Sequence, residues 1–158
     1  MPSVIFICTA NMCRSPMAEV IFRSKLNGRA DEGAWKVASA GVWGMDGNRA
    51  SSGCVAAVGK MGLDVSGHRA QSVSRELLEQ FNLILVMERS HLEALRAEFP
   101  ELRERIYLLS QIVGRQYDVR DPMGGSAADY DDTAMELEQL LGAGFDRIVQ
   151  LAGEREAK

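Results

Sequence analysis

The sequence is poor in the residues that disulfide-linked and zinc-binding proteins depend on. Its 158 residues include three cysteines and two histidines. An odd, low number of cysteines does not build a disulfide framework, and it indicates a reducing, cytoplasmic compartment. No Cys/His set of four with zinc-ligand spacing is present. We therefore expect neither a metal nor a cofactor.

Long apolar runs and basic runs are also missing. The longest clear apolar runs, residues 4–8 and 83–87, fall far short of the roughly 20 residues that a membrane span needs. The chain starts Met-Pro-Ser, with no basic region before its apolar stretch, so we expect no secretory signal. The net charge is −4, with +4 on residues 1–75 and −8 on residues 76–158. This acidic excess argues against nucleic acid as a partner.

The order of apolar and polar segments predicts an α/β fold. Apolar residues make up 46% and charged residues 25% of the chain, which is ordinary globular composition, and the length fits one domain, residues 1–158. Strands alternate with helices, which predicts a single three-layer domain with a parallel sheet covered by helices on both faces. The expected strands are 3–8, 34–39, 82–87 and 105–109, and the expected helices are 15–28, 50–61, 74–80, 90–99 and 129–154, the last loosened at Gly142 and Gly144.

Ligands of open α/β sheets bind at the carboxyl ends of the strands. The candidate loops therefore follow residues 8, 39, 87 and 109. Residues 113–128 contain Asp-Pro and Gly-Gly but no apolar periodicity. A stretch of this length without regular structure is more often functional than a simple connection.

Cys8, Arg14 and Ser15 form the most informative pattern, Cys-x5-Arg-Ser. A strand ends at Cys8, and Ser15-Pro16 has the residues of a helix N-cap and first turn. The short loop between them would point backbone N–H groups and the positive helix end at a tetrahedral oxyanion. Arg14 would add a fork of donors. Cys8 would lie beneath, with the Ser15 hydroxyl donating to its thiolate, as a nucleophile. A buried strand cysteine is the alternative, but it does not explain the rest of the pattern.

The chain at this point resembles the low-molecular-weight protein tyrosine phosphatases. The resemblance is carried by residues 4–19 (VIFICTANMCRSPMAE), 39–41 (SAG), 63–70 (LDVSGHRA), 83–88 (LILVME) and 121–126 (DPMGGS). The resemblance extends over nearly the whole length of the chain, with these segments in the family's order. The resemblance implies a four-stranded parallel sheet with helices on both faces, phosphorylated proteins as substrates, and no cofactor.

The resemblance also implies the roles of individual residues. Cys8 would be the nucleophile that forms a phosphocysteine, Arg14 would bind the phosphoryl group, and Asp121 would be the general acid. From the residues alone, Asp121-Pro122 is equally a common turn start. The implied phosphate-binding loop is Thr9, Ala10, Asn11, Met12, Cys13, Arg14 and Ser15, and the residues implied to support it are Asn11, Ser15, Ser39 and His68.

The other two cysteines and the two histidines are expected to have different roles. The resemblance implies a reversible Cys8–Cys13 disulfide that protects the nucleophile, with a small packing residue as the alternative for Cys13. Cys54 lies among small residues and is expected in the core. His68 is expected to be a hydrogen-bonded structural imidazole. His91 lies on a charged helix and is expected to be solvated.

The residues that could form the substrate pocket bear on the choice of substrate. Met12, Trp43, Met123 and Tyr130 are candidates to wall the pocket, although Trp43 and Tyr130 are equally suited to packing. Through the resemblance, the bulky Met12 favours phosphotyrosine over phosphoarginine as substrate. The Gly124-Gly125 pair, familiar from bacterial members that include arginine phosphatases, points the other way.

Other functions fit the pattern less well. A thiol-dependent arsenate reductase needs further cysteines, and none follows Cys54. A phosphocysteine carrier domain needs neither Arg14 nor an Asp-Pro acid. A module that only binds phosphoproteins would be expected to have lost Cys8 or Asp121. No Gly-x-Gly-x-x-Gly follows the first strand, which excludes a dinucleotide-binding domain.

Overall fold

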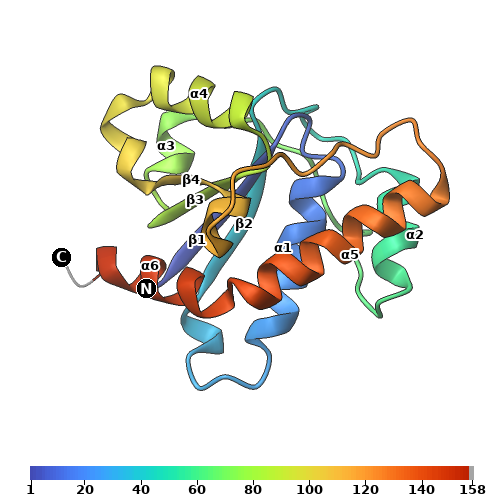
Figure 1. Ribbon diagram of the computed structural model, residues 1–158, viewed down its shortest axis with the longest axis horizontal. Coiled ribbons are helices and arrows are strands. Elements are labelled where there is room, and N and C mark those ends of the chain that lie inside the picture. Colours follow the sequence, from blue (N-terminus) through green and yellow to red (C-terminus); the bar gives the residue numbers. More distant parts are fainter. Residues whose placement is uncertain (157–158) are drawn as a thin grey trace.

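Four parallel strands form the central sheet (Figure 1). The computed structural model describes residues 1–156, so residues 157 and 158 of the predicted domain lie outside the described residues. The strand order is β2-β1-β3-β4, and all three pairings are parallel. The predicted fold class is confirmed. The strands are β1 (Ser3–Cys8), β2 (Lys36–Gly41), β3 (Leu83–Val86) and β4 (Ile106–Leu108).

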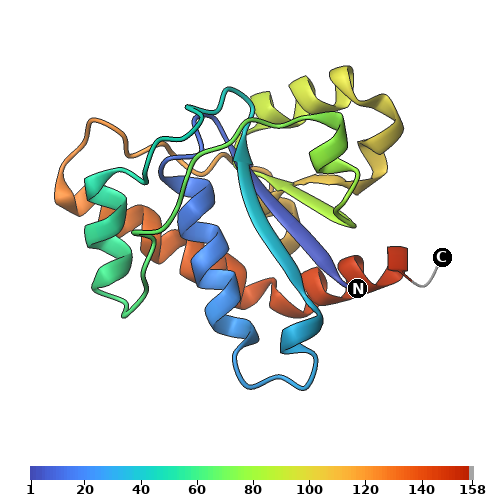
Figure 2. The ribbon, with the colours of Figure 1, turned by 180° about the vertical axis from the view of Figure 1, so that it is seen from behind.

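Helices cover both faces of this sheet, as Figures 1 and 2 show from opposite sides. Because side chains of a strand alternate between the faces, Val4 and Phe6 of β1 enter one core, whereas Ile5 and Ile7 enter the other. The first core is closed by α1 (Arg14–Leu26), α2 (Ser52–Gly59), α5 (Ala127–Ala143) and α6 (Phe145–Glu156), and the second by α3 (Arg75–Leu78) and α4 (Arg89–Glu98). Short 3-10 turns are η1 (Glu32–Ala34), η2 (Pro100–Arg105) and η3 (Leu109–Val113).

The order of the strands decides where a ligand can bind. From β1 the chain crosses to β2 on one side, and it later returns to β3 on the other side. The loops after β1 and β3 therefore leave the same edge in opposite directions and create a crevice between them. The N-terminus lies at the other end of β1 (Figure 1).

One expectation about helices is wrong, and in another the loosening expected at Gly144 is a complete break. The predicted helix 129–154 is two helices that meet at Gly144, where an added Cβ would lie 2.5 Å from Cγ2 of Ile112 and 3.0 Å from the Leu140 carbonyl oxygen. The close approach of η3 thus fixes the break. Ser15 is not the N-cap of α1, because Cys13 holds that position without a side-chain cap.

The other boundaries agree closely with the sequence patterns. The second strand begins at Lys36 rather than residue 34, because residues 32–34 form η1. Ser74 caps α3 as expected, its hydroxyl accepting from the Leu77 N–H at 3.1 Å. No helix within residues 1–156 combines the length and the apolar character that crossing a membrane requires.

Gly41, the last residue of β2, lies against the loop that follows β1. A Cβ at Gly41 would lie 2.4 Å from the Thr9 carbonyl oxygen. We expect Gly41→Ala to lower the free energy of unfolding by about 1–3 kcal/mol, since backbone must move to admit the methyl group. Urea denaturation measures this change. Gly59→Ala is the control, because nothing lies within 4 Å of its added Cβ; an equal loss there would contradict the steric explanation.

Candidate active site

The loop after β1 is held from outside by its carbonyl groups. Each of five consecutive carbonyl oxygens, from Cys8 to Met12, accepts a hydrogen bond from a residue outside the loop. The donors are the backbone N–H groups of Val42, Trp43, Met45 and Ser51 at 2.9–3.1 Å and Nε2 of His68 at 2.7 Å. The carbonyls therefore point outward around the whole turn.

This arrangement orients the loop's N–H groups toward its interior. The described peptide bonds are all trans, so each N–H points opposite to the carbonyl of the preceding residue. Within residues 1–156 no backbone carbonyl receives the N–H groups of residues 9–14. Together with the positive end of α1, they form a cradle suited to a tetrahedral anion.

The side chain of Asn11 holds the middle of the loop. Asn11 is fully buried, and its φ of 61° lies in the left-handed region, which asparagine tolerates better than most residues. Its Nδ2 donates to the hydroxyls of Ser15 at 2.8 Å and Ser39 at 2.9 Å, and its Oδ1 accepts from the Gln71 N–H at 2.9 Å. The structure thus brings together Asn11, Ser15, Ser39 and, through the Asn11 carbonyl, His68. No sequence motif pointed to Gln71.

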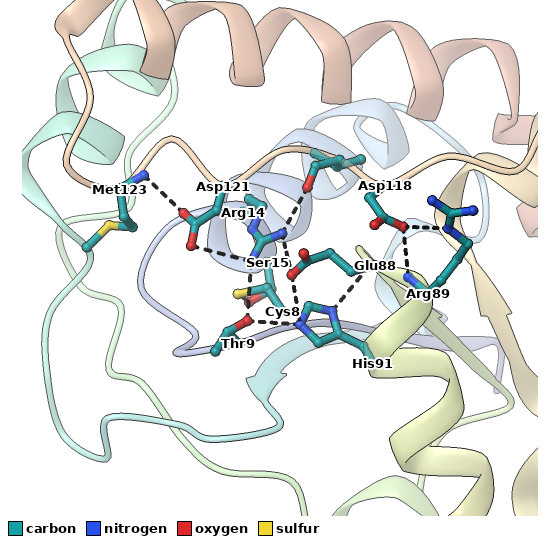
Figure 3. Close-up of polar contacts among 11 residues, drawn as sticks. Cys8, Thr9, Arg14, Ser15, Glu88, Arg89, His91, Asp118, Asp121 and Met123 are labelled. Atoms are coloured by element: carbon teal, nitrogen blue, oxygen red, sulfur yellow. Dashed lines mark hydrogen bonds and ion pairs between the residues drawn. The ribbon is translucent and has the colours of Figure 1, made fainter.

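Cys8 lies at the base of the cradle, 3% exposed. Its Sγ is 2.9 Å from Oγ of Ser15 (Figure 3). Because Ser15 Oγ accepts from Asn11, its own proton is free to be donated onward. A second acceptor, the Ala40 carbonyl, is more distant at 3.4 Å. The Ser15 hydroxyl is therefore suited to donating to a Cys8 thiolate, which explains why it does not cap α1.

Arg14 is 2% exposed and has one anchored end. Its Nη1 donates to the Val119 carbonyl at 2.9 Å and pairs with Glu88 Oε2 at 3.0 Å. Its Nη2 donates to Thr9 Oγ1 at 3.3 Å and lies 3.6 Å from Asp121 Oδ2 (Figure 3). No described side chain of residues 1–154 and no carbonyl oxygen of residues 1–156 is a partner of Nε; the recorded contacts of the guanidinium all involve Nη1 or Nη2. The edge formed by Nε and Nη2 is thus left to bind two oxygens of an anion.

Three contacts place residues 114–126, which carry Asp121, over this cradle. The Val119 N–H donates to the Met87 carbonyl at 2.9 Å, and the Arg89 N–H donates to Asp118 at 2.8 Å. The third contact is the Arg14 bond to Val119. Asp121 itself is half-exposed and accepts the Met123 N–H at 3.0 Å. A small hollow opens between loop and segment, lined by Cys8, Ala10, Met12, Cys13, Arg14, Asp121 and Met123.

The four pocket candidates are not all brought to this hollow. Met12 and Met123 line it, whereas Trp43 and Tyr130 do not. Trp43 is 80% exposed, and its backbone N–H supports Thr9. Tyr130 is buried against Gly53, where an added Cβ would lie 2.6 Å from the ring. Its hydroxyl donates to Sδ of Met123 at 3.6 Å, so Tyr130 packs behind the pocket.

His91 is not solvated, contrary to the expectation from its charged helix. It is 3% exposed, since the first turn of α4 faces the crevice between β1 and β3. Burial lowers the pKa of the imidazole; the Glu88 carboxylate opposes this shift, and the Arg14 guanidinium reinforces it. Glu88 and His91 are the site residues that sequence reasoning missed. Glu88 is the N-cap of α4 and His91 is its third residue, which is the spacing of a capping box. This spacing was the signal in the sequence that the two side chains meet.

The two remaining cysteines are in contact behind the loop. Cys54 is fully buried, as expected for a core residue, and its Sγ lies 3.7 Å from the Cys13 carbonyl oxygen. A hydrogen bond with Cys54 and burial raise the pKa of the Cys13 thiol far above its ordinary value. Cys8, Cys13 and Cys54 are all free thiols.

Comparisons with known proteins agree with this geometry. The sequence pattern of the family described as "Low molecular weight phosphotyrosine protein phosphatase" matches residues 3–152. A protein-arginine-phosphatase of Bacillus subtilis is 36% identical over 140 residues, 87% of this chain and 91% of that protein. A solved low molecular weight protein tyrosine phosphatase from T. tengcongensis is 38% identical with a TM-score of 0.85, covering 93% of this chain and 99% of that one.

A second similar structure is that of the YwlE arginine phosphatase, in a mutant with a phosphorylated active-site serine. It is 33% identical with a TM-score of 0.81 and covers 98% of this chain and 95% of the other. The chain belongs to the low molecular weight phosphotyrosine protein phosphatase family. It has the fold of these cysteine-based phosphatases, and it is a hydrolase.

Proposed function

We propose that the protein removes phosphoryl groups from proteins by a two-step reaction through Cys8. The position of Cys8 Sγ carries this proposal: it lies at the base of a loop whose carbonyls all face outward, 2.9 Å from the Ser15 hydroxyl. Backbone N–H groups and Arg14 surround the space above it. A thiolate placed beneath a bound phosphoryl group is a nucleophile aligned for attack on phosphorus.

In the first step the Cys8 thiolate forms a bond to phosphorus. The bond from phosphorus to the leaving atom breaks, and the electron pair goes to that atom, which takes a proton from Asp121. The loop N–H groups and the Nε–Nη2 edge of Arg14 hold the equatorial oxygens, whose charge redistributes in the transition state. A bound phosphoryl group would take the place of the Asp121 carboxylate beside Nη2 of Arg14, which lies 3.6 Å from Oδ2 of Asp121.

In the second step water attacks the phosphocysteine. The Asp121 carboxylate accepts the proton of the water, the sulfur–phosphorus bond breaks, and inorganic phosphate leaves. The electron pair returns to Cys8, whose thiolate the Ser15 hydroxyl stabilises. The phosphorylated active-site serine in the YwlE mutant supports a phosphoryl group on the nucleophile. Membership of a phosphatase family also favours hydrolysis of the phosphocysteine over transfer of its phosphoryl group by a carrier domain.

Cys8→Ser tests the covalent mechanism. We expect kcat with p-nitrophenyl phosphate to fall by at least about a thousandfold, because serine at this position is a far weaker nucleophile. Binding of inorganic phosphate, measured by calorimetry, should persist because the loop and Arg14 remain. Cys54→Ala is the control, and it should keep turnover. Substantial turnover by Cys8→Ser would falsify the proposed nucleophile.

We further propose phosphotyrosine as the preferred substrate. Met12 and Met123 form the apolar part of the hollow above Cys8, and such side chains suit the faces of a phenol ring. Phosphoarginine is the second candidate, because relatives at 36% and 33% identity are arginine phosphatases. The Gly124-Gly125 pair also favours it. Apolar contacts give only about 10- to 200-fold discrimination, so we expect a preference and not exclusion.

Met12→Thr should shift this preference toward phosphoarginine. A small polar residue leaves room for a guanidinium and its water, so the ratio of kcat/KM for phosphotyrosine over phosphoarginine peptides should fall by about tenfold. Met135→Thr, an exposed methionine on α5, is the matched control and should leave the ratio unchanged. A wild-type kcat/KM that is higher for phosphoarginine would overturn the substrate assignment alone.

We also propose a cytoplasmic location and reversible protection of Cys8 by Cys13. Three free thiols fit a reducing compartment. Peroxide would oxidise Cys8 to a sulfenic acid, and attack by Cys13 would then release water and form the disulfide. A hydrogen bond with Cys54 and burial raise the pKa of Cys13, so this thiol gives up its proton as it attacks, and the proton leaves with the hydroxyl group of the sulfenic acid as water.

Recovery after peroxide distinguishes a resolving Cys13 from a packing residue. We expect dithiothreitol to restore most of the activity of the wild type after a brief peroxide pulse. Cys13→Ser should stay inactive, because its sulfenic acid proceeds to irreversible states. Cys54→Ala retains the pair and removes the hydrogen bond that raises the pKa of Cys13, so it should recover at least as well as the wild type. Equal recovery of wild type and Cys13→Ser would count against the disulfide.

A further inference from the structure

His91 contacts the same two acceptors as Arg14. Nε2 of His91 lies 2.9 Å from Oγ1 of Thr9 and 3.2 Å from Oε2 of Glu88. Arg14 reaches Thr9 Oγ1 through Nη2 and Glu88 Oε2 through Nη1. Figure 3 shows the four side chains as one closed network beside Cys8. The proposed chemistry assigns no role to the imidazole.

The tautomer of His91 follows from the hydrogen bond that its Nδ1 atom makes. Nδ1 accepts the backbone N–H of Glu88 at 3.2 Å, so the proton of a neutral ring is on Nε2. Nε2–H is then a donor to Thr9 and Glu88. Neutrality agrees with a pKa lowered by burial. The charged groups that face the ring are Glu88 from its own helix end, Arg14, and Asp118 and Asp121 of residues 114–126.

A neutral donor at this place has a specific effect on Arg14. Glu88 is part-exposed, and an unrestrained carboxylate there is free to turn toward water or to follow the guanidinium. His91 supplies a second hydrogen bond to the same oxygen without adding a positive charge. It also holds the Thr9 hydroxyl as an acceptor for Nη2. Both Arg14 contacts are therefore kept in one geometry.

We propose that His91 is a positioning residue for Arg14. By fixing Thr9 Oγ1 and Glu88 Oε2, it keeps Nη1 anchored and leaves the Nε–Nη2 edge facing the bound anion. The proposal rests on the proposed function in one respect: that Arg14 binds the phosphoryl group. His91 is not among the residues that line the hollow above Cys8.

Anion binding and turnover test this role separately. We expect His91→Ala to raise the dissociation constant of inorganic phosphate about tenfold and to lower kcat/KM with p-nitrophenyl phosphate by about ten- to a hundredfold, as for loss of a buried hydrogen bond to a charged group. His91→Gln, whose amide can donate near the position of Nε2, should restore both to within about fivefold of wild type. The control is Ser90→Ala, an exposed residue in the same turn of α4, and it should change neither quantity.

Thr9→Val provides a second test of the positioning role. Because Thr9 is exposed, we expect this variant to fold. In that background His91→Ala should cost clearly less in kcat/KM than it does in the wild type. Loss of thermal stability in His91→Ala with unchanged phosphate binding, or no rescue by His91→Gln, would overturn the proposal. A wild type that binds phosphate but does not hydrolyse p-nitrophenyl phosphate would instead refute the proposed function and leave the positioning role intact.

Discussion

The buried amide of Asn11 is the contact on which the geometry of the phosphate loop depends. It joins three separate parts of the chain: the start of α1 at Ser15, strand β2 at Ser39, and the segment at Gln71. These bonds offset the cost of a left-handed backbone at Asn11, which is of the order of 1–2 kcal/mol for most side chains. With Asn11 fixed, the neighbouring carbonyls stay turned outward, and the N–H groups stay available inside.

Arg14 connects this loop with the rest of the site. It lies 105 residues before Val119 and 74 before Glu88 in the chain, yet it contacts both. Parallel strands make this possible, because their carboxyl ends all reach one edge, where the loops after β1, β3 and β4 meet. The guanidinium that holds the anion therefore also fixes the segment carrying Asp121. Anion binding and proton transfer by Asp121 therefore both depend on the position of Arg14.

The sequence patterns predicted most of the fold and the local part of the site. Strands that are buried on both faces appear in the sequence as short apolar runs. The Cys-x5-Arg-Ser spacing lies within eight consecutive residues, so it can be recognised without any knowledge of packing. The failures concern contacts between distant segments. A capping rule considers only the helix, so it could not show that Ser15 is used by Cys8 and Asn11. The polarity of α4 gave no sign that His91 faces the crevice, and the break at Gly144 depends on where η3 packs.

The position of β1 has a consequence for how the site responds to partial unfolding. β1 is paired on both sides and contributes to both cores, so its amides exchange with solvent only when the whole molecule opens. Residues 114–126 are largely exposed apart from Val119 and Pro122, and they are held to Arg14, Met87 and α4 mainly by hydrogen bonds and ion pairs. We expect their opening to need less free energy than that of β1. Low denaturant should therefore release Asp121 while β1 stays paired, so that proton transfer to the leaving group is lost first and Arg14 keeps only its contacts with Glu88 and Thr9.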